Sequence, residues 1–122
     1  MDSKYTDIVL NSVKKFLGIT EYDFFDADIL MHINTVIANL IQMGVGPQDG
    51  FRCTETSTWT DIISDNKLLE NIKSYIFLKV KLLFDPPSSS VVLASYEKQA
   101  AELEWRMYVV KDQERILAEK GG

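Results

Sequence analysis

The sequence predicts an all-α protein: a small bundle of four to five helices with one long ordered loop and a protruding C-terminal helix or tail. Three observations predict this class. Apolar residues recur at helical spacing in four segments, near residues 3–17, 26–43, 67–84 and 90–120. Glycine or proline follows each of the first three segments. Strand-prone residues gather only in the brief stretch 51–58, where a short hairpin is the alternative to an irregular loop.

Bulk composition fits one globular domain. The chain has 122 residues, of which 46% are hydrophobic and 25% charged, so it can bury a core without covalent staples. Its single cysteine, Cys53, excludes an internal disulfide and suits a reducing compartment. No run of eighteen apolar residues exists, so no membrane partner is expected. The opening MDSKYTDIVL lacks a basic region followed by an apolar stretch, so no secretion signal is expected.

Two helices are predicted before the middle of the chain. Ser3 is a candidate N-cap for the first, and Gly18 is its expected stop. Asp26 or Asp28 opens the second, which should end at Met43–Gly44. The second helix carries a regular apolar stripe made of Ile29, Ile33, Val36, Ile37, Leu40 and Ile41.

An irregular stretch follows, over residues 44–61. It holds three of the six glycines together with Pro47, which favours turns. Loops of this length in compact domains are usually functional or disordered. Phe51 and Trp59 argue against disorder. We therefore expect these two aromatic residues to order the loop and include both among the candidate interface residues of an oligomer.

Residues 67–84 form the expected central helix, because their apolar positions make two separate stripes and a helix apolar on two sides is buried on two sides. The segment DPPSSS, residues 85–90, comes next. Pro86 forces the preceding residue out of helical geometry, and the serines offer N-caps for a new helix. We interpret the segment as a stop and restart between packed helices rather than a flexible linker. The residues of this structural corner are Asp85, Pro86, Pro87 and Ser88.

The last helix is expected to run from Ser90 to about Lys120, some 45 Å at 1.5 Å per residue. A compact chain of this size has a radius of gyration of only ~14 Å. The C-terminal end must therefore leave the bundle, bend back or change conformation. We accordingly divide the chain into a helical domain, 1–108, and a C-terminal tail, 109–122, that docks on a partner.

Trp105 lies on a different face of this helix from the stripe that contains Leu103 and Met107. Aromatic residues are most often part of a core, yet Trp, Tyr and Arg are also enriched at interface hot spots. The run WRMY combines all three types. The candidate partner contacts of this helix are Trp105, Arg106, Tyr108, Ile116 and Leu117.

Catalytic, metal and cofactor sites are not expected. The chain has one histidine, His32, too few ligands for a metal site and no evident base for Cys53. GVGPQDG lacks the Gly-Lys-Ser/Thr ending of a phosphate-binding loop. The net charge of -5 argues against a protein that binds by neutralising phosphates. An enzyme is the function class with the least support.

Three stretches carry a family resemblance, and the first two are its specific parts. They are GVGPQDGF with the following TWTDI, the LLFDPPSSS corner, and YEKQAAELEWRM in the last helix. With the order and length of the helices, these stretches make the chain resemble the head–tail connector (adaptor) proteins of tailed bacteriophages, over residues from about 11 to 107.

The resemblance implies a structural function. Such proteins form a ring, a dodecamer in the virion, that docks under the portal protein after DNA packaging. The ring extends the DNA channel, lets DNA pass without sequence-specific binding, and offers a platform to the next neck or tail connector. The resemblance also implies that the C-terminal segment reaches the portal, and that the protein resides in the virion neck after assembly in the host cytoplasm.

Two alternatives stay open at this stage. One is a generic α-helical oligomerisation or regulatory partner unrelated to phage, which would bind another helix through the WRMY face. The other is a nucleic-acid-binding module, which would show salt-dependent DNA binding.

Overall fold

A computed structural model describes residues 7–63 and 66–121 of the chain. Within these ranges the backbone forms helices and no strand, apart from one isolated antiparallel bridge between Ile8 and Thr58. The helices are α2 (Val9–Leu17), α3 (Asp26–Gln42), α4 (Trp59–Ile62), α5 (Asn66–Phe84) and α6 (Ser90–Gly121). The predicted all-α class is confirmed, and residues 51–58 form a loop without the alternative hairpin. The predicted cap Ser3 lies outside the described residues.

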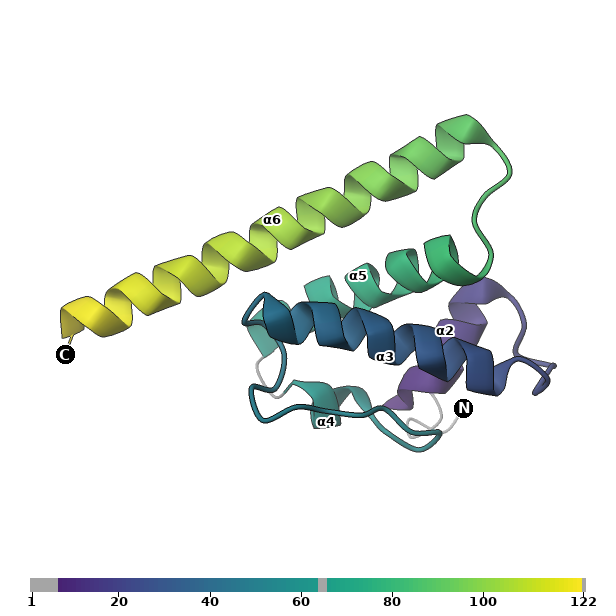
Figure 1. Ribbon diagram of the computed structural model, residues 1–122, viewed down its shortest axis with the longest axis horizontal. Coiled ribbons are helices and arrows are strands. Elements are labelled where there is room, and N and C mark those ends of the chain that lie inside the picture. Colours follow the sequence, from purple (N-terminus) through teal and green to yellow (C-terminus); the bar gives the residue numbers. More distant parts are fainter. Residues whose placement is uncertain (1–6, 64–65, 122) are drawn as a thin grey trace.

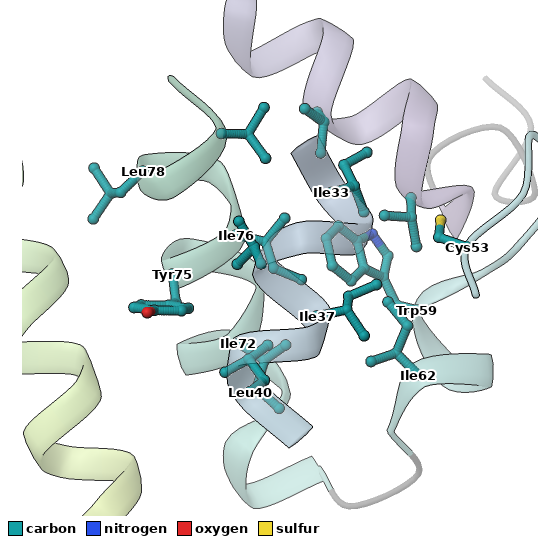
Figure 2. Close-up of a cluster of buried hydrophobic side chains, with 14 of the residues drawn as sticks. Ile33, Ile37, Leu40, Cys53, Trp59, Ile62, Ile72, Tyr75, Ile76 and Leu78 are labelled. Atoms are coloured by element: carbon teal, nitrogen blue, oxygen red, sulfur yellow. The ribbon is translucent and has the colours of Figure 1, made fainter. Parts of the chain in front are cut away.

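α5 is the central helix of the bundle. It contacts α2, α3 and α6 (Figure 1), as its two apolar stripes predict. Figure 2 shows its side chains pointing two ways: Ile72 and Ile76 face α3, while Tyr75 points toward α6. The Tyr75 hydroxyl donates a hydrogen bond of 2.9 Å to Oε1 of Glu104 on α6.

The core between α2, α3 and α5 is mostly aliphatic, with the Trp59 indole packed into it (Figure 2). The predicted stripe of α3 is buried, except that Ile41 is half-buried. Each fully buried side chain of this size contributes roughly 1.5–3 kcal/mol relative to its exposed form. The largest fully buried side chains include Ile29, Ile33, Ile37, Leu40, Leu68, Ile72, Tyr75, Ile76 and Met107.

The predicted stops of α2 and α3 are confirmed. Gly18 has φ 78° and its N–H donates back to the carbonyls at the end of α2. Gly44 has φ 81° directly after the C-cap Met43. Both glycines occupy the left-handed region, which side chains with a Cβ rarely adopt.

The corner between α5 and α6 is a stop and restart, as DPPSSS predicts. α5 ends at Phe84, and the carboxylate of Asp85 accepts a hydrogen bond of 2.8 Å from Nζ of Lys81. α6 begins at Ser90, and Oγ of Ser89 accepts a hydrogen bond of 3.4 Å from the N–H of Val92. The serine therefore caps the first turn of the new helix.

α6 is one helix of 32 residues, which spans about 48 Å. The C-terminal end was expected to leave the bundle, bend back or change conformation. It leaves the bundle, because it extends past the other helices (Figure 1). The expected division between residues 108 and 109 falls inside this continuous helix. The helix therefore places its last turns away from the bundle without a hinge.

Candidate interaction surfaces

The long loop after α3 is held against that helix by Asn34. Its Oδ1 accepts a hydrogen bond of 2.7 Å from the N–H of Cys53, and its Nδ2 donates one of 3.1 Å to the Cys53 carbonyl. The same Nδ2 also donates to the carbonyl of Leu30 at 3.0 Å. One side chain thus satisfies both backbone groups of Cys53 and fixes the loop in place.

The far end of the loop is fixed to α2. The Ser57 carbonyl accepts a hydrogen bond of 3.0 Å from the N–H of Val9, and Ser57 Oγ accepts one of 2.8 Å from the N–H of Thr54. Thr58 and Asp61 then form a capping box at the start of α4, where the Asp61 carboxylate accepts from the Thr58 N–H at 2.8 Å. The segment is therefore an ordered part of the bundle.

Trp59, a predicted interface residue, lies inside its own chain and is 4% exposed. Its Nε1 donates a hydrogen bond of 3.1 Å to Oγ of Ser12, and its ring meets Phe77 edge to face at 5.7 Å. Nζ of Lys73 lies 5.5 Å from the centre of the ring. Phe51 is half-buried against the same core. Interface roles for Phe51 and Trp59 stay predictions, and Trp59 leaves little surface for a second chain.

Cys53 is enclosed by this loop and is 2% exposed. The pKa of its thiol is raised to about 11, mainly because burial removes the thiol from water. A hydrogen bond with Ser57 lowers this pKa, and the nearby charge of Asp61 raises it. The thiol is therefore protonated at neutral pH, which disfavours a nucleophilic role.

An open groove runs between α3 and the loop. Its walls include Ala27, Met31, Thr35, Ala38, Arg52 and Glu55. No cluster of three potential metal ligands occurs in the part of the chain that the structure describes. No helix among the described residues is long and apolar enough to cross a membrane. His32 is half-buried, with its ring 6.3 Å from that of Phe84.

α6 presents two different faces. Ala100 and Met107 are buried against the bundle. On another side, Trp105 is 65% exposed and Tyr108 is 55% exposed, and their rings stack with centroids 6.1 Å apart. The separate face predicted for Trp105 is confirmed. Arg106 is also exposed and has no ion-pair partner among residues 7–63 and 66–121.

Ile116 and Leu117 are exposed on the projecting end of α6. The structure therefore gathers Trp105, Arg106 and Tyr108 on one exposed stretch and places these two aliphatic residues further along the same helix. Phe51 and Trp59 belong to the long loop and the start of α4 instead. The candidate residues form separate groups rather than one site.

The sequence analysis missed an aromatic surface on the loop between α2 and α3. Tyr22 and Phe24 are exposed there, and Phe25 is partly so. The Phe25 ring packs edge to face on both Phe24 and Phe84, with centroid distances of 5.2 and 5.3 Å. The signal that could have revealed it is EYDFFDAD, two adjacent aromatics among carboxylates with no stripe to bury them.

A buried ion pair fixes this same loop. Lys14 of α2 has a side chain only 6% exposed, and its Nζ lies 2.9 Å from the carboxylate of Asp26 and 3.2 Å from that of Asp23. Desolvation lowers the pKa of Lys14, but the hydrogen bonds and charges of Asp26 and Asp23 together raise it above its usual value. The ammonium therefore stays charged and ties the end of α2 to the start of α3.

Comparison with known proteins identifies a family for this chain. A family model described as "Phage connector protein" matches residues 9–114, which span α2 to most of α6. No curated protein and no solved structure matches the chain. The match covers most of the chain, and it includes the long loop, the DPPSSS corner and the exposed Trp105–Tyr108 stretch. The chain therefore belongs to the phage connector protein family and is a structural head–tail connector of the virion neck.

Proposed function

We propose that this connector assembles with copies of itself into a ring under the phage portal protein, as a dodecamer in the virion. The ring extends the DNA channel and gives the next neck or tail connector its platform. Membership of the connector family supports the proposal.

The observation that carries the proposal is the projecting end of α6. From residue 115 to residue 120 every side chain is exposed, and Leu117 is 68% exposed. A helix end without tertiary contacts is only marginally stable in water. Apolar side chains on such an end are expected to be covered by a partner. We assign the tail, 109–122, to docking on the portal, with Ile116 and Leu117 as the apolar contacts.

Charge supports passage of DNA rather than tight binding to it. The net charge is -5, so the chain as a whole repels phosphates. Binding that neutralises phosphates needs clustered Lys and Arg side chains. A ring of such subunits would surround DNA without sequence-specific contacts, and would assemble in the host cytoplasm before it becomes part of the virion.

The experiment that tests the proposal is native mass spectrometry of the protein mixed with portal rings from the same phage. Twelve chains of 13.9 kDa add 12 × 13.9 = 166.8 kDa to the portal. A portal complex heavier by that mass supports the proposal, whether or not the free protein is a monomer. A protein that does not bind the portal and stays a monomer or dimer supports the generic helical-partner alternative.

A shortened chain tests the role of the tail. Val110 packs partly against the core, so the cut is best made after Asp112, which removes residues 113–122. We expect an unchanged melting curve by circular dichroism and no added mass on the portal. The matched control keeps the full length and replaces Ile116 and Leu117 with Gln. Normal portal binding by both variants would show that the docking surface lies elsewhere.

A further inference from the structure

The loop between α2 and α3 carries an exposed apolar surface that the proposed portal contact does not use. We call it the aromatic loop surface and define it by Tyr22, Phe24 and Phe25. Tyr22 is 58% exposed and Phe24 is 87% exposed. Single exposed apolar residues are ordinary, but a group of them around adjacent aromatics is typical of an interaction site.

This surface is held in a fixed shape. The ion pairs of Lys14 with Asp23 and Asp26 tie the loop to α2 and α3. Phe25 is wedged between Phe24 and Phe84. A surface that is ordered before binding loses little conformational entropy when a partner arrives. The aromatic loop surface therefore suits recognition of a partner.

The charges around the surface are acidic. Residues 21–28 contain four carboxylates and no cation. Lys14 pairs with two of them, at Asp23 and Asp26, which leaves Glu21 and Asp28 without an ion-pair partner among the described residues. A partner of matching chemistry would present aromatic groups together with unpaired cations.

α6 carries such a surface on the side away from the bundle. We call it the outer face of α6 and define it by Val91, Lys98, Trp105 and Tyr108. Val91, Lys98 and Trp105 share this side because they are separated by intervals of 7 residues, close to two whole turns. Met107 lies on the side of α6 that faces the bundle, so the helix is apolar on two sides. A helix of this kind is expected to be buried on both sides.

Unpaired cations accompany the outer face. Lys98 lies on it, and Arg106 follows Trp105 directly. Neither has an ion-pair partner in the part of the chain that the structure describes. The stacked rings of Trp105 and Tyr108 offer the flat apolar area on which an aromatic residue such as Phe24 packs well.

We propose that the aromatic loop surface of one copy packs on the outer face of α6 of a second copy, with Phe24 against Trp105 and Tyr108. Glu21 and Asp28 of the first copy then face Arg106 and Lys98 of the second. The inference rests on the proposed ring and names the two surfaces that join neighbouring subunits.

The placement of the two surfaces fits a head-to-tail contact. The α2–α3 loop lies at one end of the molecule, and the C-terminal half of α6 points toward the other end (Figure 1). One chain therefore cannot satisfy both surfaces by itself. A copy that gives its loop to one neighbour keeps its own α6 free for another, which is the arrangement that closes into rings.

Disulfide trapping between two different chains tests the contact directly. One chain carries Thr20→Cys beside the aromatic loop surface, and the other carries Ala101→Cys, one turn before Trp105; both positions are exposed. These changes leave every aromatic and charged residue in place. The native Cys53 is buried with a raised pKa and does not compete. We expect the disulfide between the two different variants to form faster than a disulfide between two copies of the same variant. It should also form faster than a disulfide in which Gln48→Cys, an exposed control position, replaces one of the two cysteines.

Substitutions in the trapped pair identify the forces. Phe24→Ala in the first chain should slow trapping at least about tenfold, the loss expected for a hot-spot aromatic. Met31→Ala in the same chain, which removes a 58% exposed apolar side chain outside both surfaces, should slow it less. Arg106→Glu should also slow trapping, and Glu21→Lys in the opposite chain should restore part of the rate.

The result that would overturn the inference is a mixed disulfide that forms no faster than the Gln48→Cys control. Its failure is distinguishable from failure of the proposed function. If trapping fails while the portal still gains the mass of a ring, the subunits meet through other surfaces. If trapping succeeds while the portal gains no mass, the contact stands and the portal-docking role is wrong.

Discussion

Two loops of this connector differ in whether the aromatic side chains at them are buried or exposed. The long loop between α3 and α4 leads into Trp59, which is 4% exposed, whereas the short α2–α3 loop leaves Phe24 87% exposed. Sequence analysis selected the long loop because of its length. The structure shows that the length of a loop indicates an interaction surface less well than the direction in which its aromatic side chains point.

The difference has a physical cause. Asn34 and Ser57 bind the backbone of the long loop, so its apolar side chains turn inward against α2, α3 and α5. In the short loop, Lys14 binds two carboxylates and holds the backbone at the end of the bundle. Phe25 of that loop packs against Phe84 of α5, whereas Phe24 stays 87% exposed. The second fixed loop therefore presents its aromatics to the outside.

The largest expected difference between the loops is in stability. Trp59→Ala should lower the free energy of unfolding by about 3–5 kcal/mol, because it leaves a cavity and removes the hydrogen bond from the indole to Ser12. Phe24→Ala should change it by no more than about 0.5 kcal/mol, since the side chain is almost fully exposed. Urea unfolding followed by circular dichroism measures both.

Equal losses for the two variants would remove the contrast between the loops. A small loss at Trp59 would mean that α4 and its loop relax around the missing indole. A large loss at Phe24 would mean that the aromatic loop surface contributes to the fold, and its proposed role as a contact between copies would then need a different explanation.

The next effect concerns the side chain that fixes the long loop. Asn34→Ala removes the hydrogen bonds to both backbone groups of Cys53. Because those groups are left without their partner, we expect a loss of about 1–3 kcal/mol in the free energy of unfolding. Thr35→Ala is the matched control: it removes one exposed hydrogen bond to Met31 on the same helix and should be nearly neutral. A neutral Asn34→Ala would mean that water replaces the amide.

Alkaline pH should weaken the same loop through Cys53. Its pKa is about 11 in the folded chain, against 9.0 ordinarily. Between these values the unfolded chain has lost the proton that the folded chain keeps, so unfolding becomes easier as pH rises. The free energy of unfolding should fall above pH 9 by up to about 1.4 kcal/mol per pH unit.

A variant separates this contribution from that of Tyr75. Burial, followed by the hydrogen bond and charge of Glu104, also raises the pKa of Tyr75, which adds a loss of the same sign above its ordinary value of 10.0. Cys53→Ala should therefore flatten the curve between pH 9 and 10, lessen the slope between pH 10 and 11, and leave the part of the fall that Tyr75 causes. An unchanged slope in that interval would show that Cys53 is not the titrating group.

The helices could be read from the sequence because their signals are local. Apolar periodicity predicted α3 and the central position of α5, and DPPSSS predicted the corner before α6. The start of α2 was harder to place, because Val9 is bound by the Ser57 carbonyl, a contact 48 residues away in sequence that no local pattern encodes. The continuation of α6 from Ser90 to about Lys120 was predicted from its helix-favouring C-terminal composition.

The interaction surfaces were less predictable. The exposed Trp105 followed from helical spacing, because a position opposite to a buried stripe faces outward. Loop residues have no such rule. Whether Trp59 or Phe24 is buried depends on hydrogen bonds and ion pairs made by residues on other helices, at Ser12 and Lys14. Only the three-dimensional structure brings these partners together.

The smallest expected effect tests whether the projecting half of α6 belongs to the same cooperative unit as the bundle. Arg115 is 3.0 Å from Asp112 and 2.9 Å from Glu119, and its hydrogen bonds first to Asp112 and then to Glu119 raise its pKa. All three groups lie on the exposed side of the helix, where water and salt screen such pairs. Arg115→Gln should therefore leave the urea midpoint unchanged and only speed hydrogen exchange of the amides near residues 112–119. A lower midpoint would mean that these turns unfold together with the core, and residues 109–122 would then be part of the folded domain rather than a docking tail.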